Sequence, residues 1–147
     1  MANELIERIE SESEIKTYID RLKYALDHGA QINFQIERRV DEERAPRYTN
    51  KYTIHTLFPD EDPVIALKRE LKTLTVQEYI KTVKDQRFKN RSEMRVFGKV
   101  YNSSEDVYIK IRVELLDMFG KGTTFVMSFH FAEEAFKAAD FPYRKKE

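Results

Sequence analysis

The 147-residue sequence contains no cysteine and no tryptophan, and only four glycines, four prolines and three histidines. Without cysteine, disulfides, zinc–thiolate sites and thiol nucleophiles are excluded, and a reducing compartment is a natural setting. No run of about 18 apolar residues occurs, so we expect no membrane-spanning helix. The first residues are acidic and lack the apolar core of a signal peptide, which predicts a cytoplasmic protein.

The sequence also lacks net charge, because 26 basic and 26 acidic residues cancel. The two signs are unevenly distributed along the chain, however. Residues 1–64 carry nine Lys or Arg and fourteen Asp or Glu, whereas residues 65–147 carry seventeen and twelve. Charges act locally, over about 8 Å in physiological salt. We therefore expect one domain, residues 1–147, with an acidic helical half and a basic sheet-rich half.

Helical and strand-like patterns alternate in the first half. Apolar residues at helical spacing predict a helix over 13–28, which Gly29 ends. Alternation predicts a strand over 30–40, followed by a polar loop over 41–51. Residues 52–58 fit either a short strand or an irregular segment.

Two further helices are predicted before the basic half begins its strands. Asp62 and Pro63 are typical of a helix start, and the apolar spacing continues to 71 or 74. Thr75 and Glu78 have the spacing of a capping box, which predicts a short helix over 76–83. A polar loop over 84–93 follows.

Three strand patterns then follow in succession, over 94–101, 106–116 and 123–131. Short turns between consecutive strands predict an antiparallel meander. The tail over 133–139 has a helical pattern, and we expect residues 141–143 to hold the chain end against the body. The fold class is therefore predicted as α+β, with N-terminal helices packed on a C-terminal antiparallel sheet.

Side chains alternate across a strand, so the parity of each position assigns it to a face. In 106–116 the apolar set, which includes Val107, Ile109 and Leu115, predicts the core face. The other parity, extended to the neighbouring strands, predicts a basic and aromatic face that consists of Arg95, Phe97, Lys99, Tyr101, Tyr108, Lys110, Arg112, Ser128 and His130. An exposed antiparallel face is often merely polar, but the mostly cationic and aromatic character of this set favours a binding role.

Three short motifs resemble the motility quorum-sensing regulator toxins (MqsR-like). They are Leu-Thr-Val-Gln-Glu-Tyr-Ile-Lys-Thr over 74–82, Asp-Val-Tyr-Ile-Lys-Ile over 106–111 and Phe-Val-Met-Ser-Phe-His over 125–130. The resemblance implies a RelE-like fold, cleavage of mRNA without a metal ion or other cofactor, and inhibition by a cognate antitoxin. It also implies active-site positions for Lys81, Tyr108 and His130, and more loosely for Arg95.

Cleavage of RNA without a metal uses the 2′-hydroxyl as the nucleophile on the adjacent phosphate. The reaction needs a proton acceptor, charge on the phosphate oxygens, and a proton donor for the leaving 5′-oxygen. Histidine titrates near neutrality, and of the three histidines only His130 falls on the predicted basic face. We expect His130 to act as general acid or base, Arg112, Arg95 and Lys81 to hold the phosphate, and Tyr108 to orient it.

The remaining residues of the face predict contacts to nucleic acid. Lys110 lies beside the predicted catalytic group, Lys99 and Ser128 share its face, and the rings of Phe97 and Tyr101 suit base stacking. The alternative is a non-catalytic module that binds RNA or a protein through the same face. A homodimer that covers the basic face with the acidic half is a further arrangement that the charge distribution allows. No metal-ligand spacing occurs among the histidines.

Overall fold

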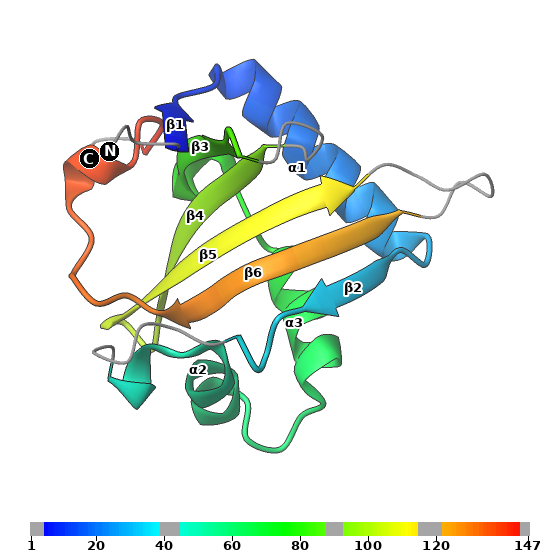
Figure 1. Cartoon of the computed structure of the whole chain (residues 1–147), viewed down its shortest axis with the longest axis vertical. Helices are drawn as coiled ribbons and strands as arrows, with labels where there is room; N and C mark the ends of the chain where they lie inside the picture. The colour runs from blue at the N-terminus through cyan, green and yellow to red at the C-terminus, as the bar shows by residue number, and fades with distance from the viewer. Residues whose placement is uncertain (1–4, 39–44, 88–92, 115–121, 145–147) are drawn as a thin grey trace.

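The computed structural model describes residues 5–38, 45–87, 93–114 and 122–144. Within these residues a six-stranded mixed sheet, in the order β1-β3-β4-β5-β6-β2, forms the centre of the molecule (Figure 1). The predicted meander is confirmed, and β2 alone of the described strands pairs in parallel. The strands are β1 (Leu5–Arg8), β2 (Gln31–Phe34), β3 (Tyr79–Asp85), β4 (Met94–Tyr101), β5 (Glu105–Glu114) and β6 (Thr123–Phe131).

Two of the predicted helices cover one face of the sheet, which we call the core face (Figure 1). Helix α1 (Glu12–Asp27) begins at Ser11, which forms a reciprocal capping box with Glu14. Helix α3 (Pro63–Leu71) begins at Asp62, whose carboxylate accepts the Ile65 N–H at 3.0 Å. The sheet and helix residues that are fully buried between these layers include Ile15, Leu22, Leu26, Leu67, Leu71, Phe97, Ile109, Ile111 and Phe129.

The prediction of a strand or irregular segment over 52–58 is wrong, because helix α2 (Asn50–Leu57) occupies this part of the chain. Thr49 caps the helix by accepting the Tyr52 N–H. Helix α2 lies along β6 beyond the end of β2 (Figure 1). It satisfies strand backbone groups there, because Thr53 Oγ1 accepts the Phe131 N–H at 2.8 Å.

The prediction of a helix over 76–83 is also wrong. The capping box of Thr75 and Glu78 forms, but it closes only a single 3₁₀ turn, Val76–Glu78, and the chain continues as β3. Backbone hydrogen bonds to β4 on one side of β3 and to β1 on the other stabilise the strand here, and they outweigh the helical propensity of the segment. The acidic start of the chain gave no pattern that predicts β1.

The tail over 133–139 is not helical, and a 3₁₀ turn at Ala138–Asp140 is its only regular structure. Residues 132–140, which we call the C-terminal segment, instead run beside the sheet on the face opposite α1. The predicted attachment of the chain end is confirmed, because Phe141 is buried and the Tyr143 hydroxyl donates to the Glu10 carbonyl.

The chain is therefore an α+β protein, as predicted. No helix among the described residues is long and apolar enough to cross a membrane. The predicted strand over 30–40 is confirmed over Gln31–Phe34, residues 35–38 are not in a strand, and residues 39 and 40 lie outside the described residues. Leu115 and most of the turn after it, together with parts of the two predicted polar loops, lie outside the described residues.

Candidate functional site

The register of β4 overturns one part of the predicted basic face. Phe97 lies opposite Ile109 and Arg95 opposite Ile111, whereas Gly98 lies opposite Tyr108. Paired residues share a face, so the odd-numbered residues of β4 point to the core face and not toward Tyr108. Both the odd-numbered and the even-numbered residues of β4 include apolar side chains, so alternation alone does not identify the core face. In the structure Phe97 is buried in the core, whereas Gly98 lies on the other face.

The four β4 residues that were expected in the site have other partners. Phe97 is fully buried, and Arg95 donates two hydrogen bonds of 2.9 Å to the carboxylate of Glu10. The other two residues also bind carboxylates: Lys99 Nζ lies 2.8 Å from Glu78 Oε2, and Tyr101 Oη lies 2.8 Å from Glu70 Oε1. These four residues therefore do not belong to the candidate site.

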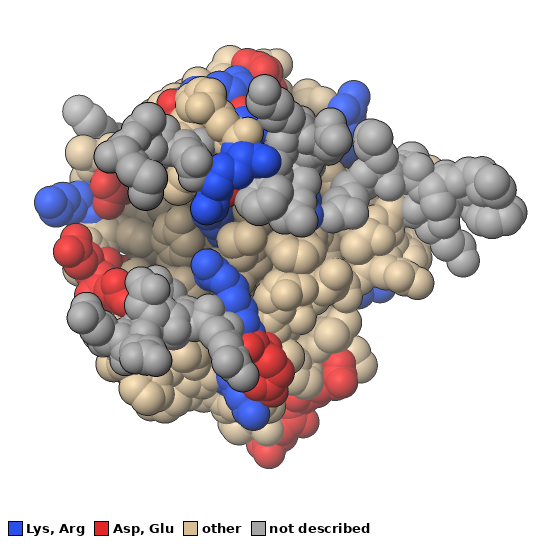
Figure 2. All heavy atoms as spheres, in the orientation of Figure 1, with Lys and Arg blue, Asp and Glu red and all other residues tan. Residues whose placement is uncertain are grey.

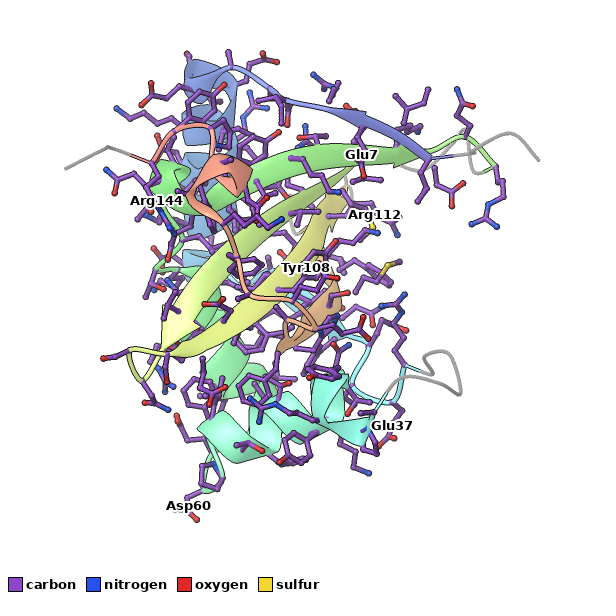
Figure 3. The ribbon with its side chains drawn as sticks, turned by 90° about the vertical axis from the view of Figure 1, so that its left-hand side faces the viewer. Glu7, Glu37, Asp60, Tyr108, Arg112 and Arg144 are labelled. Carbon is purple, nitrogen blue, oxygen red and sulfur yellow. The ribbon has the colours of Figure 1, made fainter. Side chains whose placement is uncertain are left out.

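A bulge in β6 sets the composition of the other face, which we call the open face. The register with β5 shifts at Met127, so that Val126 turns into the core while Ser128 and His130 face outward. His130 lies opposite Tyr108, and Ser128 lies opposite Lys110. The sequence-predicted grouping of these four residues is thus present on adjacent strands. Tyr108 lies on the side of the sheet away from α1 (Figure 3).

The open face is hollowed into a cleft of about 510 Å³. A band of Lys and Arg side chains crosses the middle of this face, beside a hollow (Figure 2). The size is within the range of ligand-binding clefts. The cleft is lined by Arg38, Ile80, Lys81, Tyr108, Lys110, Ser128, His130 and seven residues of the C-terminal segment.

The rings of Tyr108 and His130 form the floor of the cleft. Their centroids are 5.4 Å apart and their planes differ by 22°, so the two rings stack. His130 Nδ1 lies 2.9 Å from the carbonyl oxygen of Phe131. Because a carbonyl only accepts, Nδ1 must carry a proton, and Nε2 is the ring nitrogen that gains and loses a proton.

Three cations surround this floor. Lys81 comes from β3 and pairs with Glu7 at 2.6 Å, and Lys110 comes from β5. Arg38 follows β2 and donates to Ser128 Oγ at 3.2 Å. Burial, with the positive charges of Arg38 and Lys81, lowers the pKa of the Lys110 ammonium below its ordinary value of 10.5.

Arg112, another predicted phosphate ligand, lies two residues beyond Lys110 on the same strand and face (Figure 3). It is 8% exposed, and its guanidinium packs 4.7 Å from the centroid of the Phe125 ring. The bulge at Met127 brings this ring to the open face, since parity without the bulge would place it in the core. Arg112 is therefore buried and lies outside the set of residues that line the cleft, further along β5 from His130.

The C-terminal segment forms the wall of the cleft that faces the cations, and no sequence pattern predicts this wall. The Phe136 N–H donates to Asp106 Oδ2 at 2.9 Å, and the Phe136 ring lies over Gly98. Glu133 and Glu134 belong to this wall. The sequence predicted a helix here, but the Ala132 N–H donates to the Asp106 carbonyl and so continues the pairing of β6 with β5, and the Asp106 side chain then holds Phe136.

Among the described residues, no group of three or more acidic or histidine side chains has the arrangement of a metal site. No protein-family model, no curated protein and no solved structure matches this chain. The resemblance of its three motifs to the MqsR-like toxins therefore stays a prediction. The candidate site rests on the geometry of the cleft.

Proposed function

We propose that the protein is a metal-independent endoribonuclease that cleaves RNA by attack of the 2′-hydroxyl on the adjacent phosphate. One observation carries this proposal. An imidazole whose Nε2 exchanges the proton, a phenol and the three cations Arg38, Lys81 and Lys110 line a single cleft, and Lys137 lines it from the C-terminal segment. These are the groups that the reaction needs for proton transfer and for charge on the phosphate.

Each cleft residue has a task in this reaction. Lys81, Lys110 and Arg38 neutralise the phosphate oxygens as the phosphorus becomes pentacoordinate. Tyr108, stacked on His130, donates a hydrogen bond to the same phosphate and keeps the imidazole ring in position. His130 transfers a proton through Nε2. Arg112 binds the RNA backbone further along β5.

The substrate that suits this site is single-stranded RNA, because the acidic C-terminal segment faces the cations across the cleft. A second phosphate backbone would lie against Glu133 and Glu134 and be repelled. By the resemblance of its motifs, we propose an mRNA interferase that works in the cytoplasm and is held inactive by an antitoxin protein.

The alternative function is a non-catalytic RNA-binding module. The observation that favours it is the stacked pair of Tyr108 and His130 on the floor of the cleft, since aromatic rings on a sheet face also bind bases without cleavage. Binding and cleavage are separable by experiment, because a module binds RNA in a salt-dependent manner and leaves it intact.

The test is an RNA cleavage assay in EDTA with the wild type, His130→Ala, Tyr108→Phe and Arg112→Ala. His55→Ala is the matched control, because His55 is exposed on α2. We expect His130→Ala to lose 10²-fold or more of the rate, roughly the contribution of a general acid or base, while His55→Ala keeps it. Intact RNA with the wild type, or equal cleavage by His130→Ala, contradicts the proposal.

A further inference from the structure

Contacts to Asp106 and Gly98, one set before Glu134 and one after it in the chain, place Glu134 at the cleft. Before it, the Ala132 N–H donates to the Asp106 carbonyl at 2.9 Å. After it, the Phe136 N–H donates to the Asp106 carboxylate and the Phe136 ring rests on Gly98. The short stretch between these contacts therefore holds its side chains at the cleft wall.

The carboxylate of Glu134 has no hydrogen bond and no ion pair within the part of the chain that the structure describes. Its neighbour Glu133 does have an interaction partner. Most acidic side chains around the sheet are likewise paired, as Glu7 is with Lys81 and Glu10 with Arg95. An unpaired carboxylate in a cleft with three cations and a histidine is available to a substrate.

We propose that Glu134 is the general base of the reaction and that His130 is its general acid. This inference rests on the proposed ribonuclease function and divides the two proton transfers between the floor of the cleft and its C-terminal wall. The Glu134 carboxylate takes the proton of the 2′-hydroxyl, whose oxygen forms the new bond to phosphorus. The bond from phosphorus to the 5′-oxygen breaks, and the His130 imidazolium gives its Nε2 proton to that oxygen. The products are a 2′,3′-cyclic phosphate and a 5′-hydroxyl.

The layout of the cleft favours this division of roles. Attack and departure lie on opposite sides of the phosphorus in an in-line displacement, so the base and the acid belong on opposite sides of the phosphate. Glu134 is on the C-terminal segment, whereas His130 is on β6. The bond from Nδ1–H to the Phe131 carbonyl orients the imidazole with Nε2 as the proton-transferring atom.

A substrate that needs no general acid separates the two roles. We would measure cleavage of the four nucleoside 3′-(4-nitrophenyl phosphates), and of RNA, by Glu134→Gln, Glu134→Asp and His130→Ala. The 4-nitrophenolate leaves without a proton, so His130→Ala should lose 10²-fold or more on RNA but little on these esters. Glu134→Gln should lose about 10²-fold on both substrates, and Glu134→Asp should recover part of the rate.

Asp20→Asn, on the exposed side of α1 and outside the cleft, is the control, and we expect it to change either rate less than about threefold. If Glu134→Gln keeps full activity on both substrates, this inference fails while the ribonuclease function stands. Equal losses in Asp20→Asn and Glu134→Gln also overturn it. If the wild type cleaves neither substrate, the proposed function itself fails.

Discussion

At the scale of single residues, Glu10 organises the polar network on the core face. It is 5% exposed, and its carboxylate accepts hydrogen bonds from Arg95 and from Thr82, the latter at 2.6 Å. Its N–H donates to the Tyr79 hydroxyl, and its carbonyl accepts from Tyr143. The network therefore joins the start of the chain, β3, β4 and the chain end.

We predict that Glu10→Gln lowers the free energy of unfolding by about 2 kcal/mol at neutral pH, because Arg95 loses its charged partner. Urea denaturation measures this loss. Asp20→Asn, on the exposed side of α1, is the control and should change stability little. Equal stability of the two variants would contradict the assigned role of the network.

The pH dependence of stability gives a second prediction for Glu10. Burial raises the pKa of this carboxyl, but hydrogen bonds from Arg95 and Thr82 and the charges of Arg95 and Arg8 outweigh burial, so the pKa lies below the ordinary 4.5. A carboxyl with a lowered folded-state pKa contributes stability above its unfolded pKa and loses it as the pH falls through the folded pKa. We expect wild-type stability to fall below about pH 4.5, and Glu10→Gln to flatten this fall. A parallel fall in both proteins would contradict this cause.

Gly98 gives a third prediction at this scale. A Cβ at this position would lie 2.6 Å from Cε2 of Phe136, closer than packed atoms allow. Gly98→Ala should therefore cost about 1–2 kcal/mol of unfolding free energy. In a Phe136→Ala background the same change should cost almost nothing. A double-mutant cycle measures the coupling, and additive effects would show that the C-terminal segment does not rest on Gly98.

At the scale of elements, α2 replaces a missing strand beside β6. Strand β2 pairs with β6 only as far as Val126. Beyond that residue, Asn50 of α2 accepts the Phe129 N–H at 3.0 Å and donates to the Met127 carbonyl at 2.9 Å. This buried amide holds β6 on both sides of Ser128, next to the bulge that brings Phe125 to the open face.

We predict that Asn50→Ala destabilises the protein by about 2–3 kcal/mol, because the buried Phe129 N–H is left without a partner. Thr56→Ala, at an exposed position of the same helix, is the control. Hydrogen exchange adds a local readout, since the Phe129 amide should lose protection more than the amides of β4. Unchanged exchange at Phe129 would contradict the capping role of Asn50.

The elements also show what the sequence could and could not predict. Strict alternation in β5 correctly assigned Tyr108 and Lys110 to the open face. Parity failed in β4, where both sets of residues suit a buried position, so that only pairing with Ile109 places Phe97 in the core. Parity also assigned Phe125 and Val126 of β6 to the wrong faces. The bulge at Met127 depends on contacts with β5 and Asn50, which are distant in sequence.

At the scale of the whole molecule, a chain of zero net charge brings cations from three separate parts of its sequence to one side of the cleft. Arg38, Lys81 and Lys110 line it, although Arg38 comes from the acidic half of the sequence. Charge counting along the chain predicted a basic surface but not Arg38, because the turn after β2 reaches the cleft only in the folded protein.

We predict that binding of single-stranded RNA weakens with salt with a logarithmic slope of about −2, as three neutralised phosphates would give. Lys81→Ala should reduce the slope by about 0.7, whereas Lys68→Ala, exposed on α3, should leave it unchanged. Fluorescence anisotropy of a labelled RNA at several salt concentrations measures both slopes. A slope near zero would mean that the cleft does not bind RNA phosphates.

The central claim is that the cleft cuts RNA by attack of its own 2′-hydroxyl, and the ends of the products test it most directly. Mass spectrometry of an RNA incubated with the wild type in EDTA should find 2′,3′-cyclic phosphate and 5′-hydroxyl ends, and His130→Ala should yield almost none. Fragments with 3′-hydroxyl and 5′-phosphate ends, or an uncut RNA, would contradict the account.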